Sequence, residues 1–246
     1  MMITKTDLNK VKEMAKLLVE YPIEPCCKVS EGLGSFFLSH PIFRDRIISK
    51  PVPKTEENPV GLEMLDIVLK ENQEEARKLY RHAIDKQRDV FGIFMIINKP
   101  YAGFFFNLIK DFLNEEDYAT MLEYLWTSME YPNTDKNVSK YQFIDLWKKA
   151  NLSYIYSDED KDVLARLPEE FLVYRGLMKG AKKQALSWTL DPSRAVWFAK
   201  RFDNNGKVYK ALCKKKDILV YLSCRNEEEI VVDWRKLKNI EEISYV

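Results

Sequence analysis

The chain is poor in the residue types on which several large enzyme classes depend. Of its 246 residues, only two are histidine and eight are glycine. Neither His40 nor His82 stands in an HExxH or HxE context, so zinc hydrolase and zinc deaminase chemistry is not expected. The nearest approach to a glycine-rich dinucleotide turn is Gly32-Leu33-Gly34, where Phe37 replaces the third glycine, and there is no P-loop. A Rossmann-type nucleotide site is therefore not expected.

Cysteines are also few and irregularly spaced. Cys26 and Cys27 are adjacent, whereas Cys213 and Cys224 stand alone, which matches neither a disulfide framework nor a CxxC metal site. We expect no bound metal and a reducing, cytoplasmic setting. The count leaves a cysteine nucleophile paired with histidine open, but no sequence around a cysteine supports one.

Long hydrophobic runs and a dominant charge are absent as well. No stretch approaches about 18 apolar residues, and the polar segment 1–7 has no apolar segment behind it, so neither a membrane span nor a secretion signal is expected. The two most apolar stretches, 90–97 and 102–109, are separated by Lys99-Pro100 and predict buried core. With 39 basic and 38 acidic residues, no global field favours nucleic acid or an anionic membrane as a partner.

The periodicity of apolar residues predicts an α+β protein, with a helical region over 1–165 and a strand-rich region over 166–246. Apolar residues recur at near-helical spacing over 76–94, and Pro100 closes that run. A second helix is expected to open at Asn114, an N-cap candidate followed by three acidic residues. The segment 49–59 holds three prolines and predicts a loop or a boundary.

After Leu167-Pro168 the apolar period changes to two. We expect short strands over 171–175, 185–190, 207–213, 218–222 and 229–233. Alternation places Ser187 and Thr189 on one face of their strand, opposite Trp188. It also groups Glu227 with Glu229, if the strand already runs through 227. A helix is expected to begin at Asp191-Pro192 and to pack on the sheet.

Four short motifs in this region, taken in order, resemble the ADP-ribosyltransferase superfamily of the arginine-serine-glutamate type. They are Val173-Tyr174-Arg175-Gly176, Leu186-Ser187-Trp188-Thr189, Ala195-Val196-Trp197-Phe198-Ala199 and Glu227-Glu228-Glu229-Ile230-Val231-Val232. The resemblance covers roughly the last 75 residues. The whole chain is also similar to uncharacterised proteins carried by phages and prophages, which implies action inside a bacterial host. The motifs are individually short, so their order and strand context carry the resemblance.

The resemblance implies a split antiparallel β-sheet that binds NAD as a substrate. Arg175 would hold the nicotinamide-side ribose and the phosphates, because a planar guanidinium forms paired hydrogen bonds with phosphate oxygens. Ser187 would position the last glutamate, and Thr189 would support the strand and the cofactor. Glu229 would stabilise the positive charge that develops on the ribose as nicotinamide leaves. Glu227 matches the variant of the family that modifies arginine, in which it orients or deprotonates the incoming guanidinium.

Each of these residues also has an ordinary structural explanation. Arg175 could bridge to a carboxylate, the hydroxyl residues could line a solvent face, and the glutamates could form a charged turn. Glu228 could replace one of its neighbours in a different register. The loop residues Asn133, Asp135 and Asn137 could cover the cleft, although such residues are first of all turn formers. Nearby aromatic residues, including Trp188, Trp197 and Phe198, are expected to be mostly core.

The sequence thus predicts a mono-ADP-ribosyltransferase that modifies a macromolecule, with a protein arginine as the favoured acceptor. Two alternatives stay open. One is an NAD glycohydrolase, and the other is a catalytically idle fold that serves as a phage structural or interaction protein. The helical region could be a recognition domain or a lid, or it could form one continuous domain with the sheet.

Overall fold

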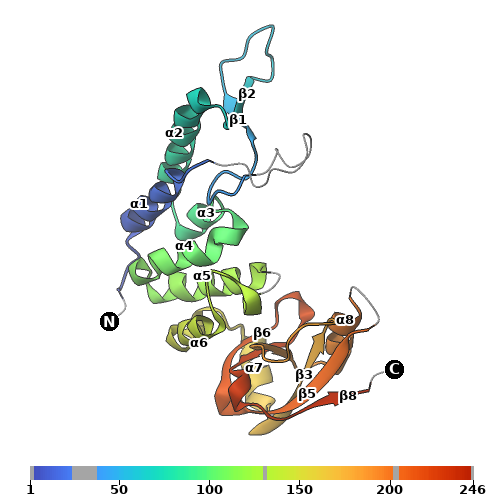
Figure 1. Cartoon of the computed structure of the whole chain (residues 1–246). Coiled ribbons are helices and arrows are strands. Elements are labelled where there is room, and N and C mark those ends of the chain that lie inside the picture. Colours follow the sequence, from blue (N-terminus) through green and yellow to red (C-terminus); the bar gives the residue numbers. More distant parts are fainter. Residues whose placement is uncertain (1–2, 24–37, 130–131, 202–204, 245–246) are drawn as a thin grey trace. The chain divides into compact units, whose positions relative to one another are not determined.

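The chain forms two compact units, residues 1–128 and 129–246 (Figure 1). The computed structural model describes residues 3–23, 38–129, 132–201 and 205–244. Cys26, Cys27 and the Gly32-Leu33-Gly34 turn lie outside them. The prediction of an α+β protein is confirmed, because helices accompany antiparallel sheets. The division between units lies 37 residues before the expected boundary at 165/166, so two helices join the sheet region.

In its described residues, unit 1 is mostly helical, with one β-hairpin. Its helices bury apolar side chains against one another, and the core includes residues of both apolar stretches expected to be buried. The helices and strands are α1 (Leu8–Val19), β1 (Ile47–Pro51), β2 (Leu62–Asp66), α2 (Lys70–Lys86), α3 (Val90–Phe94), α4 (Ala102–Ile109) and α5 (Glu115–Ser128).

Two expectations for unit 1 are corrected. The single helix expected over 76–94 is two helices, because Gln87 is extended and Asp89 caps a new helix by accepting a hydrogen bond from the Gly92 amide at 2.7 Å. The loop expected over 49–59 begins as strand β1, which pairs with β2 as far as Pro51. By contrast, Asn114 caps α5 as expected, since its side chain accepts a hydrogen bond from the Asp117 amide at 2.8 Å.

Unit 2 contains a six-stranded antiparallel sheet and three α-helices within its described residues. The strand order is β6-β7-β4-β3-β5-β8. Five of these strands overlap the expected ones, and β8 was not anticipated. The elements are α6 (Lys140–Lys149), α7 (Asp158–Arg166), β3 (Glu170–Leu177), β4 (Ser187–Thr189), α8 (Pro192–Lys200), β5 (Lys207–Lys214), β6 (Ile218–Leu222), β7 (Glu229–Val232) and β8 (Lys238–Ile243).

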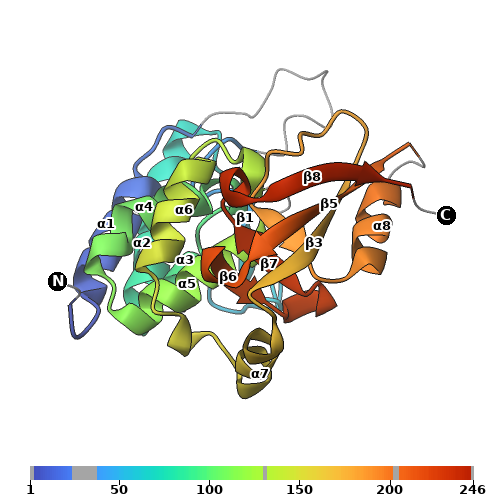
Figure 2. The same ribbon diagram turned by 90° about the horizontal axis from the view of Figure 1, so that it is seen from below.

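The helices α7 and α8 cover opposite faces of this sheet (Figure 2). Val173 and Trp188 belong to the cluster against which α7 packs, whereas Tyr174 packs with the buried alanines of α8. At Gly176 the α8 backbone comes so close that a Cβ atom would stand 1.9 Å from the Ala195 carbonyl oxygen. A glycine is therefore required at this point of β3.

The sheet is split between β3 and β4. β3 pairs with β5 from Glu170 to Leu177, but it pairs with β4 only where Tyr174 faces Thr189, as far as the described residues show. The halves β6-β7-β4 and β3-β5-β8 are thus joined by a single backbone pair. Both strands continue past this point without pairing with each other.

Candidate functional site

Arg175 stands at the split in the sheet. It follows Tyr174, the last β3 residue that pairs with β4, and its guanidinium donates a hydrogen bond to the Ser187 carbonyl oxygen on β4. Its side chain thus bridges the two half-sheets where their backbones no longer pair.

The guanidinium of Arg175 is incompletely satisfied. Its Nε is fully enclosed and has no hydrogen-bond partner in the described part of the chain. Burial lowers the pKa of Arg175 to about 10, and the nearby negative charge of Glu229 acts in the opposite direction. At neutral pH the group is still a cation, held in a place where water compensates it poorly.

Thr189 fixes the turn that carries the three consecutive glutamates. Its hydroxyl donates to the Glu227 carbonyl oxygen at 2.6 Å and accepts from the Asp191 amide at 3.0 Å. Next to it, the Leu190 amide donates to the Glu228 carbonyl oxygen at 3.1 Å. Thr189 therefore holds the backbone of the glutamate turn against the start of α8.

Glu229 begins β7 and is buried, with 5% of its surface exposed. It pairs directly with Thr189 across the ladder between β4 and β7, and Ser187 faces Val231 two positions along. Ser187 and Thr189 share a face, as expected, and Trp188 is buried in the core on the other side. The carboxylate thus lies in a row with Thr189, next to the split that Arg175 bridges.

Glu227 does not share the strand with Glu229, contrary to the condition on which their pairing was predicted. It lies in a helical turn conformation, and Glu228 has a left-handed backbone with φ of 44°. Alternation therefore does not decide between Glu227 and Glu228 as the companion of Glu229. The two residues differ in solvent exposure, since Glu227 is half-buried and Glu228 is exposed.

Two residues from before the sheet hold the segment that leads into β4. Asn133 accepts a hydrogen bond from the Leu186 amide at 2.6 Å, and Lys140 Nζ donates to the Gln184 carbonyl oxygen at 2.6 Å. The sequence had suggested Asn133, Asp135 and Asn137 as a loop over the cleft. Asp135 instead forms a turn, accepting from the amides of Asn137 and Val138 at 2.7 Å each.

Lys140 was not anticipated as a site residue. It stands 35 positions before Arg175 and carries no local motif, so only the fold brings the two cations together. Among the aromatic residues, Trp197 was expected to be mostly core but is 48% exposed on α8, between Arg194 and Arg201.

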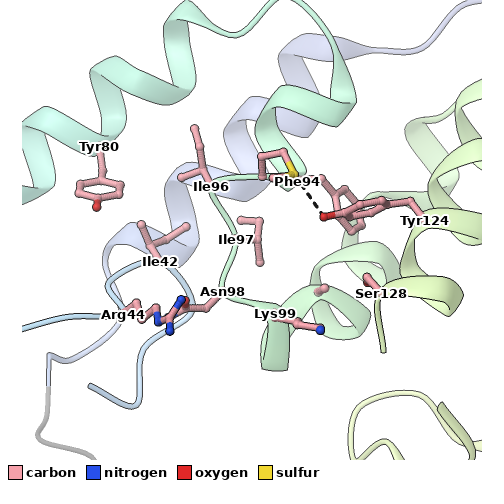
Figure 3. A pocket seen from close by; sticks show the side chains of 12 residues that line it. Ile42, Arg44, Tyr80, Phe94, Ile96, Ile97, Asn98, Lys99, Tyr124 and Ser128 are labelled. Atoms are coloured by element: carbon pink, nitrogen blue, oxygen red, sulfur yellow. Dashed lines mark hydrogen bonds between the residues drawn. The ribbon is translucent and has the colours of Figure 1, made fainter. Parts of the chain in front are cut away.

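A cavity of about 570 Å³ lies elsewhere, in unit 1 (Figure 3). In Figure 3, Arg44, Asn98 and Lys99 lie on one side of it and apolar side chains on the other. None of the five candidate residues lines it, since all of them belong to unit 2. The lining residues are Ile42, Arg44, Tyr80, Phe94, Met95, Ile96, Ile97, Asn98, Lys99, Ala102, Tyr124 and Ser128.

Neither a metal site nor a membrane span is evident in the described ranges. No group of three or more histidine, cysteine, aspartate or glutamate side chains there could hold a metal ion. The helices of these ranges are all too short or too polar to cross a membrane. Burial raises the pKa of the Cys213 thiol to about 12, which leaves it unreactive at neutral pH.

Comparison with known proteins does not identify the chain. No protein-family model, no curated protein and no solved structure matches it.

Proposed function

We propose that unit 2 is an ADP-ribosyltransferase-like domain that cleaves NAD at the nicotinamide N-glycosidic bond and transfers ADP-ribose to a macromolecular acceptor, with a protein arginine favoured. The split antiparallel sheet supports this proposal, because it carries Arg175 on its first strand, Ser187 and Thr189 on the second, and Glu229 on the fifth. This is the arrangement that the sequence motifs imply for a chain that binds NAD without a glycine-rich turn.

The observation that carries the proposal is the unsatisfied guanidinium of Arg175 beside the buried carboxylate of Glu229. A buried charge without full compensation costs stability, so its presence is a typical sign of a ligand site. A diphosphate supplies the missing acceptors, since guanidinium pairs well with phosphate oxygens. The carboxylate next to it suits a reaction that develops positive charge.

The proposed reaction proceeds by departure of nicotinamide. The bond between ribose C1′ and the nicotinamide nitrogen breaks, its electron pair leaves with neutral nicotinamide, and positive charge develops on the ribose. Glu229, accepting a hydrogen bond from the ribose 2′-hydroxyl, stabilises that charge. A nitrogen of the acceptor guanidinium then bonds to C1′ and loses a proton, which Glu227 accepts or passes to water. Thr189 acts through the backbone of the glutamate turn.

The test uses NAD labelled with ³²P on its adenylate phosphate, incubated with the purified protein in a bacterial lysate. A Glu229→Gln variant of equal fold, checked by circular dichroism, runs beside the wild type. Label transferred to protein by the wild type, and reduced about 1000-fold by the variant, supports a transferase in which the carboxylate stabilises the transition state. A Glu228→Gln variant is the matched control and is expected to retain activity.

The remaining outcomes separate the alternatives. Label recovered as free ADP-ribose indicates an NAD glycohydrolase that uses the same site. Label on nucleic acid rather than protein overturns the choice of acceptor but keeps the reaction. Intact NAD in both samples, in lysates of several bacterial hosts, overturns the enzymatic proposal and leaves the idle, partner-binding fold.

A further inference from the structure

A cluster of cations surrounds the split in the sheet of unit 2, beyond the arginine of the sequence motif. Lys140, in the first turn of α6, donates a hydrogen bond to the Gln184 carbonyl oxygen at 2.6 Å. Arg175 donates one to the carbonyl oxygen of Ser187, three residues after Gln184. Both cations therefore hold the same short segment at the entrance of β4. They reach it from elements that lie far apart in the sequence.

The connection between β3 and β4 adds more positive charge to this place. Residues 178–186 include Lys179, Lys182 and Lys183 and contain no acidic residue. All three of these lysines are exposed. This short, lysine-rich connection leads directly to Arg175, whose Nε has no hydrogen-bond partner among the described residues. The positive charges together raise the local electrostatic potential, which attracts anions.

The ammonium group of Lys140 is held rather than free. It lies 4.4 Å from the centre of the Trp234 ring, in the geometry of a cation–π contact, while it donates to Gln184. Burial lowers the pKa of Lys140, and the positive charges of Lys182 and Arg175 lower it further. The charges of Lys182 and Arg175 thus oppose that of Lys140, while the negative charge of Glu229 acts on Arg175 in the opposite direction.

We propose that Lys140 and Lys182 complete an anion site with Arg175, and that this site binds the diphosphate of the dinucleotide. The inference rests on the proposed function for the identity of the ligand. Three neighbouring cations match the two negative charges of a diphosphate better than one arginine does, and binding relieves the repulsion between them. Lys140 is then a binding residue supplied by α6.

The experiment compares four ligands by calorimetric titration of the full chain at fixed salt: ADP-ribose, NAD, inorganic pyrophosphate and nicotinamide riboside. Lys140→Met is expected to lower the affinity for each of the three ligands that carry a diphosphate about 10-fold, which corresponds to the loss of one charge-assisted hydrogen bond. Nicotinamide riboside, which has no phosphate, should show no such change. Lys140→Arg should restore most of the affinity.

The matched control is Lys216→Met, which removes the same charge from an exposed position of unit 2. Lys216 follows Lys214, which pairs with Glu170 five residues before Arg175, so it lies far along the strand from the split. The control is expected to bind all four ligands as the wild type does. Thermal unfolding of each variant confirms that the fold is kept, and Lys182→Met provides a second test if Lys140→Met does not fold.

The outcomes distinguish this inference from the proposed function. An equal loss of affinity for all four ligands in Lys140→Met overturns the inference, because it indicates that Lys140 only positions the segment before β4. Unchanged affinity for ADP-ribose overturns it as well. Pyrophosphate binding that depends on Lys140 in a protein that does not cleave NAD supports the anion site while the enzymatic proposal fails. A wild type that binds neither pyrophosphate nor ADP-ribose overturns both.

Discussion

His40 in unit 1 and Arg175 in unit 2 differ in how far their buried polar atoms are hydrogen-bonded. In unit 1, the fully buried His40 is completely satisfied, because its Nδ1 accepts hydrogen bonds from the amides of Ile42 and Phe43 at 3.0 Å each, and its Nε2 contacts the Tyr21 carbonyl oxygen at 3.1 Å. In unit 2, Arg175 keeps an enclosed Nε without a partner. The buried polar atoms of His40 all serve the fold, whereas the enclosed Nε of Arg175 marks a candidate ligand site.

Arginines repeat this contrast. Arg46 in unit 1 forms a fork with Asp66, with Nε at 2.9 and 2.8 Å from the two carboxylate oxygens. Among the described residues, Arg175 has a carbonyl oxygen as hydrogen-bond acceptor and the nearby charge of Glu229. One guanidinium is used to join two strands of a hairpin, and the other is left available to an anion.

The largest expected effect is a loss of NAD binding in Arg175→Met. Removing the buried cation should reduce NAD turnover at least 100-fold, as expected for loss of a buried, hydrogen-bonded charge pair with phosphate. The free energy of unfolding should stay within about 1 kcal/mol of the wild type, since the lost charge was poorly compensated. NAD consumption and urea unfolding measure the two quantities.

Arg46→Met is the control for that prediction, and it should show the reverse pattern. It leaves Asp66 without its main partner and should lower the stability of unit 1 while NAD turnover is unchanged. Turnover of Arg175→Met within threefold of the wild type would break the contrast between the two arginines.

A second effect, of about 3 kcal/mol, concerns pH and unit 1. Burial lowers the pKa of His40 from its usual value of 6.5 to about 4. The unfolded chain therefore takes up a proton before the folded one does, and the stability that His40 contributes is present above pH 6.5 and is lost as the pH falls towards 4. Urea unfolding at several pH values in this window measures the loss.

His40→Asn provides the comparison, because its side-chain oxygen can accept from the same amides without titrating. The difference in stability between wild type and variant should shrink or change sign as the pH falls from 6.5 to 4. Parallel curves for the two proteins would show that His40 does not titrate in this range. NAD turnover at neutral pH should be the same in both.

The third prediction sharpens the comparison within one strand. Gly176 is the neighbour of Arg175 but faces α8, so Gly176→Ala should cost about 2–3 kcal/mol through contact with the Ala195 carbonyl oxygen. Gly180→Ala, in open space with φ of 83°, should cost only about 1 kcal/mol of backbone strain. Thermal unfolding of both variants checks the order, and equal losses would contradict the close approach of α8.

The smallest effect is expected for Glu228→Gly. Glycine adopts the left-handed conformation of position 228 without steric cost, so stability should rise by at most about 1 kcal/mol. NAD turnover should be kept, because Glu228 is exposed and is not the proposed catalytic carboxylate. A loss of turnover comparable to that of Glu229→Gln would assign the catalytic role to Glu228 instead.

Local signals predicted those parts of the fold that local residues determine. The cap at Asn114, the start of α8 at Asp191-Pro192 and strand β6 were all predicted correctly, because capping side chains, a proline at the first helical position and apolar alternation act over a few residues. Strand β8 was missed since its exposed residues show no apolar alternation.

The candidate site was predictable in its residue types but not in its arrangement. Arg175, Ser187, Thr189 and Glu229 come close through the sheet, as the order of the motifs suggested. The turn at Glu228 could not be foreseen, because a non-glycine residue with positive φ leaves no pattern in the sequence. The position of Lys140 at the site depends on its contact with Gln184, 44 residues further along the chain, and no local sequence pattern indicates such a contact.

The single backbone pair between Tyr174 and Thr189 has a consequence for how such a chain can diversify. Residues 178–183 pair with neither half-sheet, so their length can change over generations without shifting the register of any strand. Arg175 and Glu229 stay anchored in their ladders meanwhile. Selectivity for what enters the split can thus evolve separately from the groups proposed to carry out the chemistry.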